Sequence, residues 1–441
     1  MKSPTWSRRE FLEVSAAASA AIAAQPFKFR PVAPSDTVRF GMVGVGMQGS
    51  GLLGTSIQLP GVTCAGAADL YDGRHTLAKE IAGATLPTTR RYQQLLDDKN
   101  IDCIVAAVPD HWHRKIVIDA VSAGKDIYCE KPMSHTAADG VAMVDAVKKT
   151  NRIVQIGSQR VSSQICAKAK ELIGQGAIGE LMMVEARLGR NSPTGAWEYP
   201  PPPDLSTRTL DWDTWQGDVP KRALDPNIFA RWRCWKEYGT GVAGDLLVHL
   251  VSGMMFMLGI NEPPKQATSV GGIRRWKDGR NMPDVHMVQY YFGDLPVSMR
   301  LNLGTEIQET YWFHGAKGVL ELTGSRITVT PQSGKDDWPS YYTGSYPSAL
   351  RQAYETKWHQ ENDPKLGQSA VFSEATTYTA PDFDDTRVHL WTYFEAVRSR
   401  KPVVEDVVFG HNAALACHMA NEAYARRSAV SWDETSKTIS G

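Results

Sequence analysis

Long apolar runs, excess charge of one sign and closely spaced cysteines are all missing from this 441-residue sequence. It has no stretch of 18 or more apolar residues, which argues against an ordinary transmembrane helix. The balance of 48 basic against 48 acidic side chains argues against a nucleic-acid binder, whose phosphate contacts need clustered Lys and Arg. Hydrophobic residues make up 42% of the chain, enough for packed cores, and the length suggests two or three domains.

The six cysteines form no metal or redox motif. No two have C-x-x-C spacing, and Cys64, Cys103 and Cys129 lie in or beside apolar runs typical of buried strands. His111 and His113 are two residues apart in a turn, without the cluster of acids or cysteines that a metal site needs. We therefore predict neither disulfide bonds nor a bound metal.

The first two dozen residues have the pattern of an export signal. Ser7-Arg8-Arg9-Glu10-Phe11-Leu12 places two arginines before an apolar pair, and an alanine-rich run follows over 14–23. The alternative, an amphipathic first helix, lacks an apolar stripe of 3.6-residue period. The pattern predicts a twin-arginine signal peptide and linker over residues 1–34, and hence an exported, periplasmic location.

A glycine-rich turn follows the first apolar run after this segment. Residues 38–43 predict a buried strand, Gly44-Val45-Gly46-Met47-Gln48-Gly49 forms the turn, and a helix continues to about residue 58. In a dinucleotide site, Gly44 permits the tight turn, Gly46 lets a pyrophosphate approach, and Gly49 lets the helix lie against the strand. The helix then offers backbone N–H groups, including those of Met47 and Gln48, to the phosphates.

The residues after the second predicted strand indicate which dinucleotide binds. That strand covers 62–68 and ends at Asp69, 20 positions after Gly49, the spacing expected of a ribose-binding acid. Asp69 would accept hydrogen bonds from the ribose hydroxyls and repel a 2′-phosphate, which favours NAD over NADP. Arg74 is the nearby residue that would accommodate that phosphate, and the alternative role of Asp69 is to cap a helix.

Strands and helices continue to alternate as far as residue 157. Predicted strands cover 101–108, 126–129 and 153–157, with helices between them. This order predicts an α/β fold with a doubly wound parallel sheet, the NAD-binding domain, over 35–160. Ligands of such sheets bind beyond the carboxyl ends of the strands. Two turns lie at such ends, Pro109-Asp110-His111-Trp112-His113 and Glu130-Lys131-Pro132. From these turns we assign five residues to the cofactor site: Pro109, Asp110, His111, Glu130 and Lys131.

With the segment Gly241-Val242-Ala243-Gly244-Asp245-Leu246-Leu247-Val248-His249, four motifs stand in a familiar order. Together they resemble the glucose–fructose oxidoreductase/inositol dehydrogenase (Gfo/Idh/MocA) family, and the resemblance extends from Val38 to Trp432. It implies a substrate domain over 161–441 with an open, mostly antiparallel sheet and C-terminal helices. It also implies a homo-oligomer, because another subunit often covers that sheet in the family. Apolar runs supply the strands: 181–188, 266–273, 285–292, 297–303, 310–313, 317–322 and 326–330.

The same resemblance implies a catalytic centre of three residues. His249 would take the proton of a sugar hydroxyl as hydride leaves for NAD, while Lys131 would orient that hydroxyl and Asp245 would hold the substrate or His249. Asp245 and His249 are four residues apart in a helical run and so share one face, and a histidine pKa near 6.5 suits a general base. The alternatives are a buried core histidine, a solvated lysine, and a capping or salt-bridge role for the aspartate.

An irregular stretch rich in tryptophan lies between residues 191 and 238. Loops of this length are usually functional or disordered, and so many tryptophans argue against disorder. Because aromatic rings stack on sugars and arginines donate to hydroxyls, we assign Arg231, Trp232 and Trp235 to substrate binding. The alternative is that the loop packs its own apolar side chains.

These observations predict an exported NAD-dependent oxidoreductase that moves hydride from a ring carbinol of a sugar or glycoside to nicotinamide. Since free NAD is scarce outside the cytoplasm, a retained NAD recycled in each turnover is expected. Two alternatives use the same residues: an NAD-dependent glycosidase that oxidises, eliminates, hydrates and reduces its substrate, and a non-catalytic sugar-binding protein. No nucleic-acid partner and no membrane insertion are expected.

Overall fold

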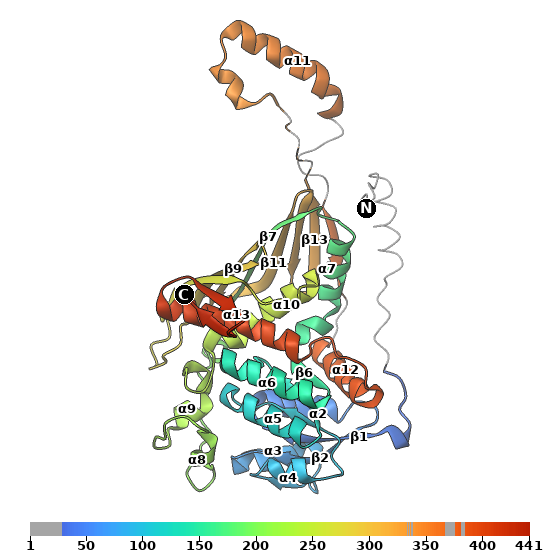
Figure 1. Cartoon of the computed structure of the whole chain (residues 1–441), viewed down its shortest axis with the longest axis vertical. Coiled ribbons are helices and arrows are strands. Elements are labelled where there is room, and N and C mark those ends of the chain that lie inside the picture. The colour runs from blue at the N-terminus through green and yellow to red at the C-terminus, as the bar shows by residue number, and fades with distance from the viewer. Residues whose placement is uncertain (1–28, 333, 335, 337, 367–374, 381–383) are drawn as a thin grey trace.

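Two β-sheets organise the chain in a computed structural model that describes residues 29–332, 334, 336, 338–366, 375–380 and 384–441 (Figure 1). The twin-arginine motif and the alanine-rich run lie outside these residues. Within the described part, no helix combines the length and apolar character that crossing a membrane requires.

The first sheet has six parallel strands in the order β3-β2-β1-β4-β5-β6, as the alternating pattern predicted. Helices α5 and α6 pack on one face, and α2 and α3 pack on the other, which makes the sheet doubly wound. The elements are β1 Val38–Val43, α2 Met47–Ser56, β2 Val62–Ala68, α3 Asp72–Ala82, β3 Thr88–Thr89, α4 Gln93–Asp97, β4 Cys103–Ala106, α5 His113–Ser122, β5 Asp126–Glu130, α6 Ala137–Thr150 and β6 Val154–Gly157.

Helix α12, Asp385–Ser399, also belongs to this first layer. Its Leu390, Trp391 and Phe394 are buried among the side chains of β1 and α2. We had assigned all of residues 161–441 to the substrate domain. Helix α12 differs from that expectation, because it packs against the first sheet. The reason is that α12 presents an aromatic face which the first sheet covers.

The second sheet has ten strands in the order β14-β13-β12-β11-β7-β10-β9-β8-β15-β16. Among the described strands of this sheet, only β7 and β10 pair in parallel, which confirms the mostly antiparallel sheet. The strands are β7 Leu181–Gly189, β8 Gln266–Gly272, β9 Val285–Phe292, β10 Leu295–Asn302, β11 Ile307–Gly315, β12 Gly318–Thr323, β13 Arg326–Pro331, β14 Thr376–Thr379, β15 Val430–Asp433 and β16 Thr438–Ser440.

One face of this sheet is covered and the other is open. Helices α7 (Gln164–Gly174), α10 (Val248–Leu258) and α13 (Val407–Arg426) contribute to one apolar core with its strands. Strand β9 alternates accordingly, since Val288, Tyr290 and Phe292 are buried whereas Met287 and Tyr291 are exposed.

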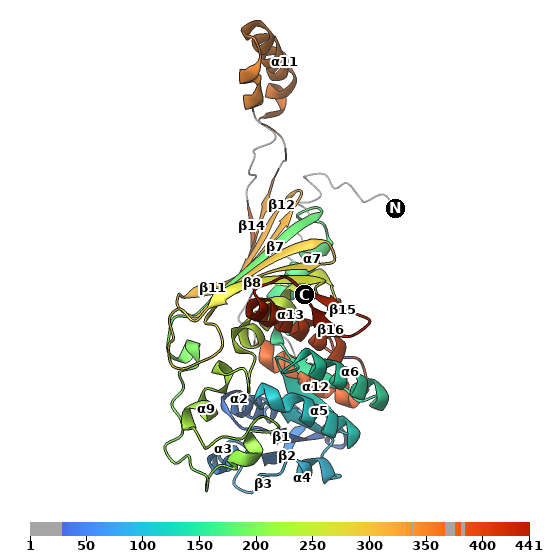
Figure 2. The same ribbon diagram turned by 60° about the vertical axis from the view of Figure 1, so that its left-hand side comes forward.

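Among the described residues, helices α8, α9 and α11 lie outside these layers. Helices α8 (Trp212–Trp215) and α9 (Pro226–Ala230) stand beside the first sheet in the loop that precedes α10. Helix α11, Ser348–Leu366, stands apart from the body beyond the second sheet in both ribbon views (Figures 1 and 2).

Candidate active site

A cavity of about 840 Å³ runs along the carboxyl ends of the parallel strands. The ends of β1, β2 and β5 form its floor, and residues from 190–233 form its outer wall. Asp245 and His249 close one end of it. The volume is in the range of a ligand-binding cleft, and the position is the one expected for a doubly wound sheet.

The glycine turn is shaped for close approach of a ligand to the backbone. Gly44 has φ +83°, and a Cβ there would lie 2.3 Å from the carbonyl oxygen of Ala107. Gly46, the N-cap of α2, has no atom within 4 Å of its ideal Cβ position and no side-chain cap. Because the first N–H groups of α2 have no partners within the helix, they can bind a pyrophosphate. Gly49 is a packing residue, since a Cβ there would lie 2.0 Å from the oxygen of Gly44.

Asp69 and Arg74 line the cavity at the end of β2, as predicted for the ribose pocket. The carboxylate of Asp69 accepts hydrogen bonds from the backbone N–H groups of Val45 (2.8 Å) and Tyr71 (3.0 Å). Burial raises the pKa of Asp69, although these two donors oppose the shift. Arg74 donates to the carbonyl oxygen of Val45 at 3.3 Å. The carboxylate thus stiffens the turn and still faces the cavity.

Asp110 and His111 have structural positions rather than the cofactor contact we predicted, and neither lines the cavity. Asp110 is buried and accepts from the backbone N–H (2.9 Å) and hydroxyl (2.7 Å) of Thr240. The two ring nitrogens of His111 face the carbonyl oxygens of Tyr238 and Trp215. Both residues therefore fasten the 109–113 turn to the second domain. Pro109, by contrast, lines the cavity.

Glu130 forms a buried polar cluster at the end of β5. One carboxylate oxygen accepts from the side-chain amides of Gln48 (3.0 Å) and Gln159 (3.2 Å), and from the hydroxyl of Tyr128 at 3.3 Å. Burial raises the pKa of Glu130, while the charge of Lys131 opposes that shift. The cluster links the start of α2 to the catalytic end of the cavity. The predicted cofactor residues Met47 and Gln48 also line it.

Lys131 and Asp245 form a partly buried ion pair across the two domains. The Lys131 ammonium donates to Oδ1 and to the carbonyl oxygen of Asp245, both at 2.9 Å. Arg233 Nε donates to the same Oδ1 at 3.0 Å, and the indole N–H of Trp197 donates to Oδ2 at 3.1 Å. Burial opposes ionisation, but the positive charges of Lys131 and Arg233 lower the pKa of Asp245 strongly. Asp245 is therefore an anion that fixes the lysine.

His249 lines the same end of the cavity. Its Nδ1 is buried and has no hydrogen-bond partner among the described residues. Burial lowers the pKa of His249 well below 6.5, and the charges of Lys131 and Arg160 add to this effect. The imidazole is therefore neutral at pH 7 and able to accept a proton. We had expected a regular helix here, but residues Ala243–Leu247 form a π-helical turn before α10, an irregularity common at functional sites.

The sequence analysis did not identify two residues of the site. Arg190 follows β7 and lines the cavity, and Trp197 lies fully buried at φ +63°, a conformation that is unusual for a bulky side chain. Only the tertiary structure brings Trp197 to Asp245. The richness of the loop in tryptophan was the available signal, and it pointed to the stretch rather than to this residue.

The aromatic loop divides between cavity and core. Trp232 lines the cavity, with the Arg233 guanidinium 4.2 Å from its ring centroid. Trp235 and Arg231 do not line it, contrary to our assignment. Trp235 packs against two apolar clusters, and Arg231 bonds to Glu198. The alternative interpretation, that the loop packs its own apolar side chains, holds for these positions.

The loop also closes over the adenosine end of the cavity. Leu210 pairs with Tyr71 in an isolated β-bridge, and the Tyr71 hydroxyl donates to Asp204. The backbone N–H of Asp72 donates to Thr209 (2.9 Å). Trp212 and Trp215 stack with centroids 4.8 Å apart in the cluster beneath this contact. We call residues 204–215 the strap.

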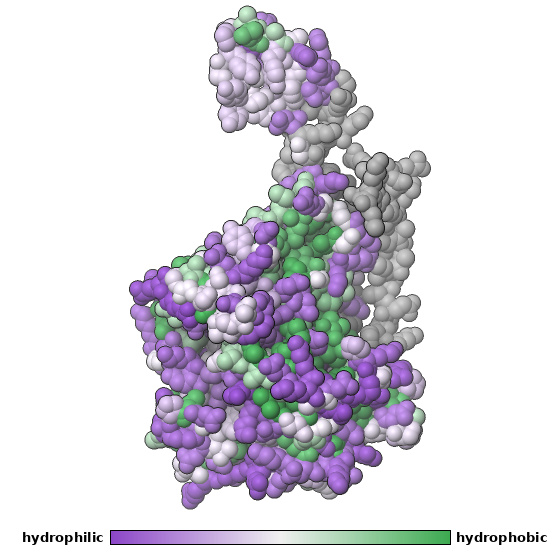
Figure 3. Space-filling model, in the orientation of Figure 1, coloured by the Kyte–Doolittle hydropathy of each residue, from purple (hydrophilic) through white to green (hydrophobic). Residues whose placement is uncertain are grey.

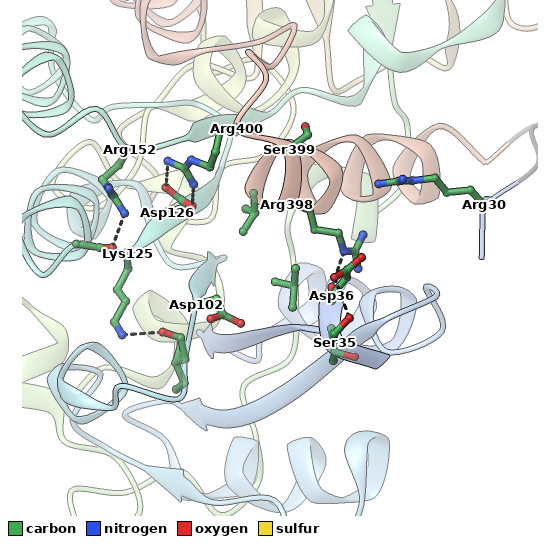
Figure 4. A pocket seen from close by; sticks show the side chains of 15 residues that line it. Arg30, Ser35, Asp36, Asp102, Lys125, Asp126, Arg152, Arg398, Ser399 and Arg400 are labelled. Atoms are coloured by element: carbon green, nitrogen blue, oxygen red, sulfur yellow. Dashed lines mark hydrogen bonds and ion pairs between the residues drawn. The ribbon is translucent and has the colours of Figure 1, made fainter. Parts of the chain in front are cut away.

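A second cavity of about 640 Å³ lies at the opposite, amino ends of β1, β4 and β5 (Figure 4). Most of its cations are already bonded. Arg400 pairs with Asp126, Lys125 donates to carbonyl oxygens, and Arg398 donates to the carbonyl oxygen of Asp36 at 3.0 Å. These contacts fasten α12 to the first sheet, so we assign the cavity a structural role. Within the described residues, no group of three metal-ligating side chains occurs.

Comparisons with known proteins agree with this architecture. Residues 38–158 match the family model GFO_IDH_MocA, described as an oxidoreductase family with an NAD-binding Rossmann fold. Levoglucosan dehydrogenase of Pseudarthrobacter phenanthrenivorans is 29% identical over 286 residues, 58% of this chain and 66% of that protein. Inositol 2-dehydrogenase of Salmonella typhimurium is 31% identical over 153 residues, 34% of this chain and 46% of that protein. The matches thus span less than two thirds of these relatives.

Solved structures resemble the chain over more of its length. Levoglucosan dehydrogenase in complex with NADH and levoglucosan superposes with a TM-score of 0.64 at 19% identity, covering 90% of this chain and 99% of that one. Aldose–aldose oxidoreductase from Caulobacter crescentus, complexed with glycerol, gives 0.63 at 16% identity, with the same coverage. At these identities the likeness shows a shared fold. With its glycine turn and six-stranded parallel sheet, the region 38–158 has the architecture of the NAD-binding Rossmann fold that the matching oxidoreductase family model describes.

Proposed function

We propose that the protein is an NAD-dependent dehydrogenase that oxidises a ring hydroxyl of a sugar or glycoside. The observation that carries this proposal is the meeting of Lys131, Asp245 and His249 at one end of a cavity that also contains the glycine turn. Relatives named levoglucosan dehydrogenase and inositol 2-dehydrogenase support a polyhydroxylated substrate.

The residues at hand fit NAD and divide the work of the reaction. The start of α2 would hold the pyrophosphate, and Asp69 would face the ribose. NAD, when bound, supplies the hydride acceptor. The neutral His249 would take the hydroxyl proton, and the Lys131 ammonium would stabilise the negative charge that develops on the same oxygen. Asp245 keeps Lys131 in place, because both its carboxylate oxygen Oδ1 and its backbone carbonyl oxygen accept hydrogen bonds from the lysine ammonium.

Variants at the proposed base and its partner lysine test the assignment. We expect His249→Ala and Lys131→Ala each to lower NAD-linked sugar oxidation by about 10²-fold or more, because a positioned acid or base contributes that much. NAD affinity should change little, because Lys131, although also assigned to the cofactor site, has its ammonium bonded to Asp245, and neither residue belongs to the glycine turn that would hold the pyrophosphate. His314→Ala on β11, outside the cavity, is the matched control. Turnover retained in His249→Ala would remove the base from the mechanism, and aglycone release without net NADH would indicate the glycosidase instead.

We infer that the protein is exported with NAD already bound and that it keeps the cofactor between turnovers. The twin-arginine pattern supports export, and the strap supports retention because it is bonded to the Rossmann domain over the adenosine end. Protein purified from the cytoplasm should carry NAD that survives gel filtration. Tyr71→Phe, which removes the bond to Asp204, should raise the rate of NAD loss severalfold. NAD that dissociates from the parent protein within seconds would refute retention.

We also infer self-association through the open face of the second sheet. Met182, Val270, Met287 and Tyr291 are exposed large apolar residues on its strands, with Val270 66% exposed. On the side of the molecule where α7 packs, Figure 3 shows further apolar surface around that helix. Light scattering should give a mass above that of one chain, and Val270→Asp with Tyr291→Asp should reduce it. A monomeric parent protein would contradict the inference.

A further inference from the structure

Arg190 is a cation in the substrate end of the cavity without a partner. It directly follows β7, where its backbone N–H donates to the carbonyl oxygen of Asn302 at 2.8 Å. Its side chain is half-buried, lines the cavity, and has no ion pair or hydrogen bond to any described residue. His249 and Tyr199 line the same cavity as Arg190.

The other cations nearby are already engaged. Lys131 and Arg233 share the single carboxylate of Asp245. Around His249, the described lining residues thus include three cations and two carboxyls, Asp245 and Glu130, even if Glu130 is counted as ionised. Glu130 is itself occupied by the amides of Gln48 and Gln159. The excess positive charge therefore resides on Arg190.

Leaving such an arginine unpaired in a partly desolvated pocket is unfavourable unless a ligand completes it. A guanidinium presents a planar fork of N–H donors that matches a carboxylate with two parallel hydrogen bonds. A neutral hydroxyl would accept one such bond but leave the charge uncompensated. The charge balance thus favours an anionic group on the substrate itself.

We propose that the natural substrate is a sugar acid whose carboxylate binds Arg190 while a ring hydroxyl faces Lys131 and His249. This inference rests on the proposed function and names its substrate class. Uronates and their glycosides carry both groups on one ring. The end of β7 holds Arg190 and α10 holds His249 in the same cavity, so the two contacts together would fix the ring orientation.

Binding without turnover tests the proposal. We would load the protein with NADH, so that no oxidation can run, and titrate matched pairs by calorimetry: glucuronate with glucose, and galacturonate with galactose. At least one acid should bind tenfold or more tightly than its neutral counterpart, and added salt should weaken that preference. Equal or tighter binding of the neutral sugars, or no binding of either kind, would overturn the proposal.

Arg190→Gln assigns the preference to this residue. The variant should lose tenfold or more of its affinity for the acid and bind the neutral sugar within twofold of the parent protein. Arg300→Gln is the matched control, because it removes the same charge from an exposed position on the neighbouring strand β10, outside the cavity. A loss of NADH affinity in Arg190→Gln would place the arginine on the cofactor and refute its role toward the substrate.

Turnover measured in parallel separates this inference from the proposed function. Preferential binding of the acid without any NAD-linked oxidation would contradict the dehydrogenase and retain the sugar-acid site. Oxidation of neutral sugars with no preference for acids in the NADH-loaded titration would retain the dehydrogenase and refute the sugar-acid site.

Discussion

Replacing Asp245 by asparagine removes the anion that holds two partly buried cations. The carboxylate accepts hydrogen bonds from Lys131 at 2.9 Å, Arg233 at 3.0 Å and Trp197 at 3.1 Å. An asparagine of the same shape keeps one acceptor oxygen and turns an NH₂ group toward the remaining donors. Removing one member of a buried ion pair typically costs about 3–5 kcal/mol.

The expected magnitude for Asp245→Asn lies at the lower end of that range. The side chains of Lys131 and Asp245 are 12% and 15% exposed, so some water reaches the pair. We expect the free energy of unfolding to fall by about 3 kcal/mol. The midpoint of urea unfolding, followed by tryptophan fluorescence, measures this change. Asp294→Asn is the control, because the Asp294 side chain is fully exposed and pairs only loosely with Lys265 (3.6 Å), and its effect should stay below about 0.5 kcal/mol.

A double-mutant cycle identifies the cause. If the loss in Asp245→Asn comes from stranded positive charge, then adding Lys131→Met should restore part of it, and the two changes should couple by about 1–3 kcal/mol. Additive effects of the two substitutions would mean that the interaction between Lys131 and Asp245 contributes little to the free energy of unfolding. A loss below about 1 kcal/mol in Asp245→Asn alone would refute the claim that this carboxylate holds the site together.

Three further outcomes are expected. NAD should bind at least tenfold more tightly than NADP, about 1.4 kcal/mol, because the Asp69 carboxylate faces the ribose pocket; equal affinities in apo protein would show that Arg74 governs it. The free energy of unfolding should fall as the pH drops from 6.5 toward 4. Burial lowers the pKa of His111 and His389 to about 4 in the folded protein, so between these pH values only the unfolded chain takes up their protons. A free energy of unfolding that does not change over this pH range would contradict the prediction. Trp232→Ala should raise KM severalfold with little change in kcat, whereas Trp235→Ala should lower the melting temperature instead; the reverse pattern would return Trp235 to the substrate site.

The Rossmann half of the molecule could be predicted from the sequence because its signals are local. Glycine spacing, the apolar runs and the acid after β2 each follow from contacts within about thirty residues. The seven predicted strands of the second sheet were also found, because an apolar run marks their positions in the sequence. Strands β14, β15 and β16 were missed because they are short and pair at the sheet edges, where burial no longer imposes a clear alternation.

The site was harder to predict because its contacts are long-range. His111 looked like a pocket residue from its position at a strand end, yet its ring bonds to Tyr238 and Trp215, more than a hundred residues away. The sequence separation of Asp110 and Thr240 also gives no indication that the two side chains form a hydrogen bond. A strand end places a residue near the cavity, but side-chain direction decides between lining it and fastening the turn beneath it.

The π-helical turn shows how one local irregularity ties these features together. Four-residue spacing in an α-helix stacks Asp245 above His249 on one face, as the sequence suggested. The wider turn over Ala243–Leu247 instead sends the carboxylate toward Lys131, Arg233 and Trp197, and it leaves the Nδ1 atom of His249 unbonded. Asp245 raises the pKa of His249, but burial and the positive charges of Lys131 and Arg160 outweigh it, and the carboxylate bonds to the cations rather than to the imidazole. Asp245, in the π-helical turn, therefore holds Lys131 by hydrogen bonds while the proposed base, His249, stays neutral.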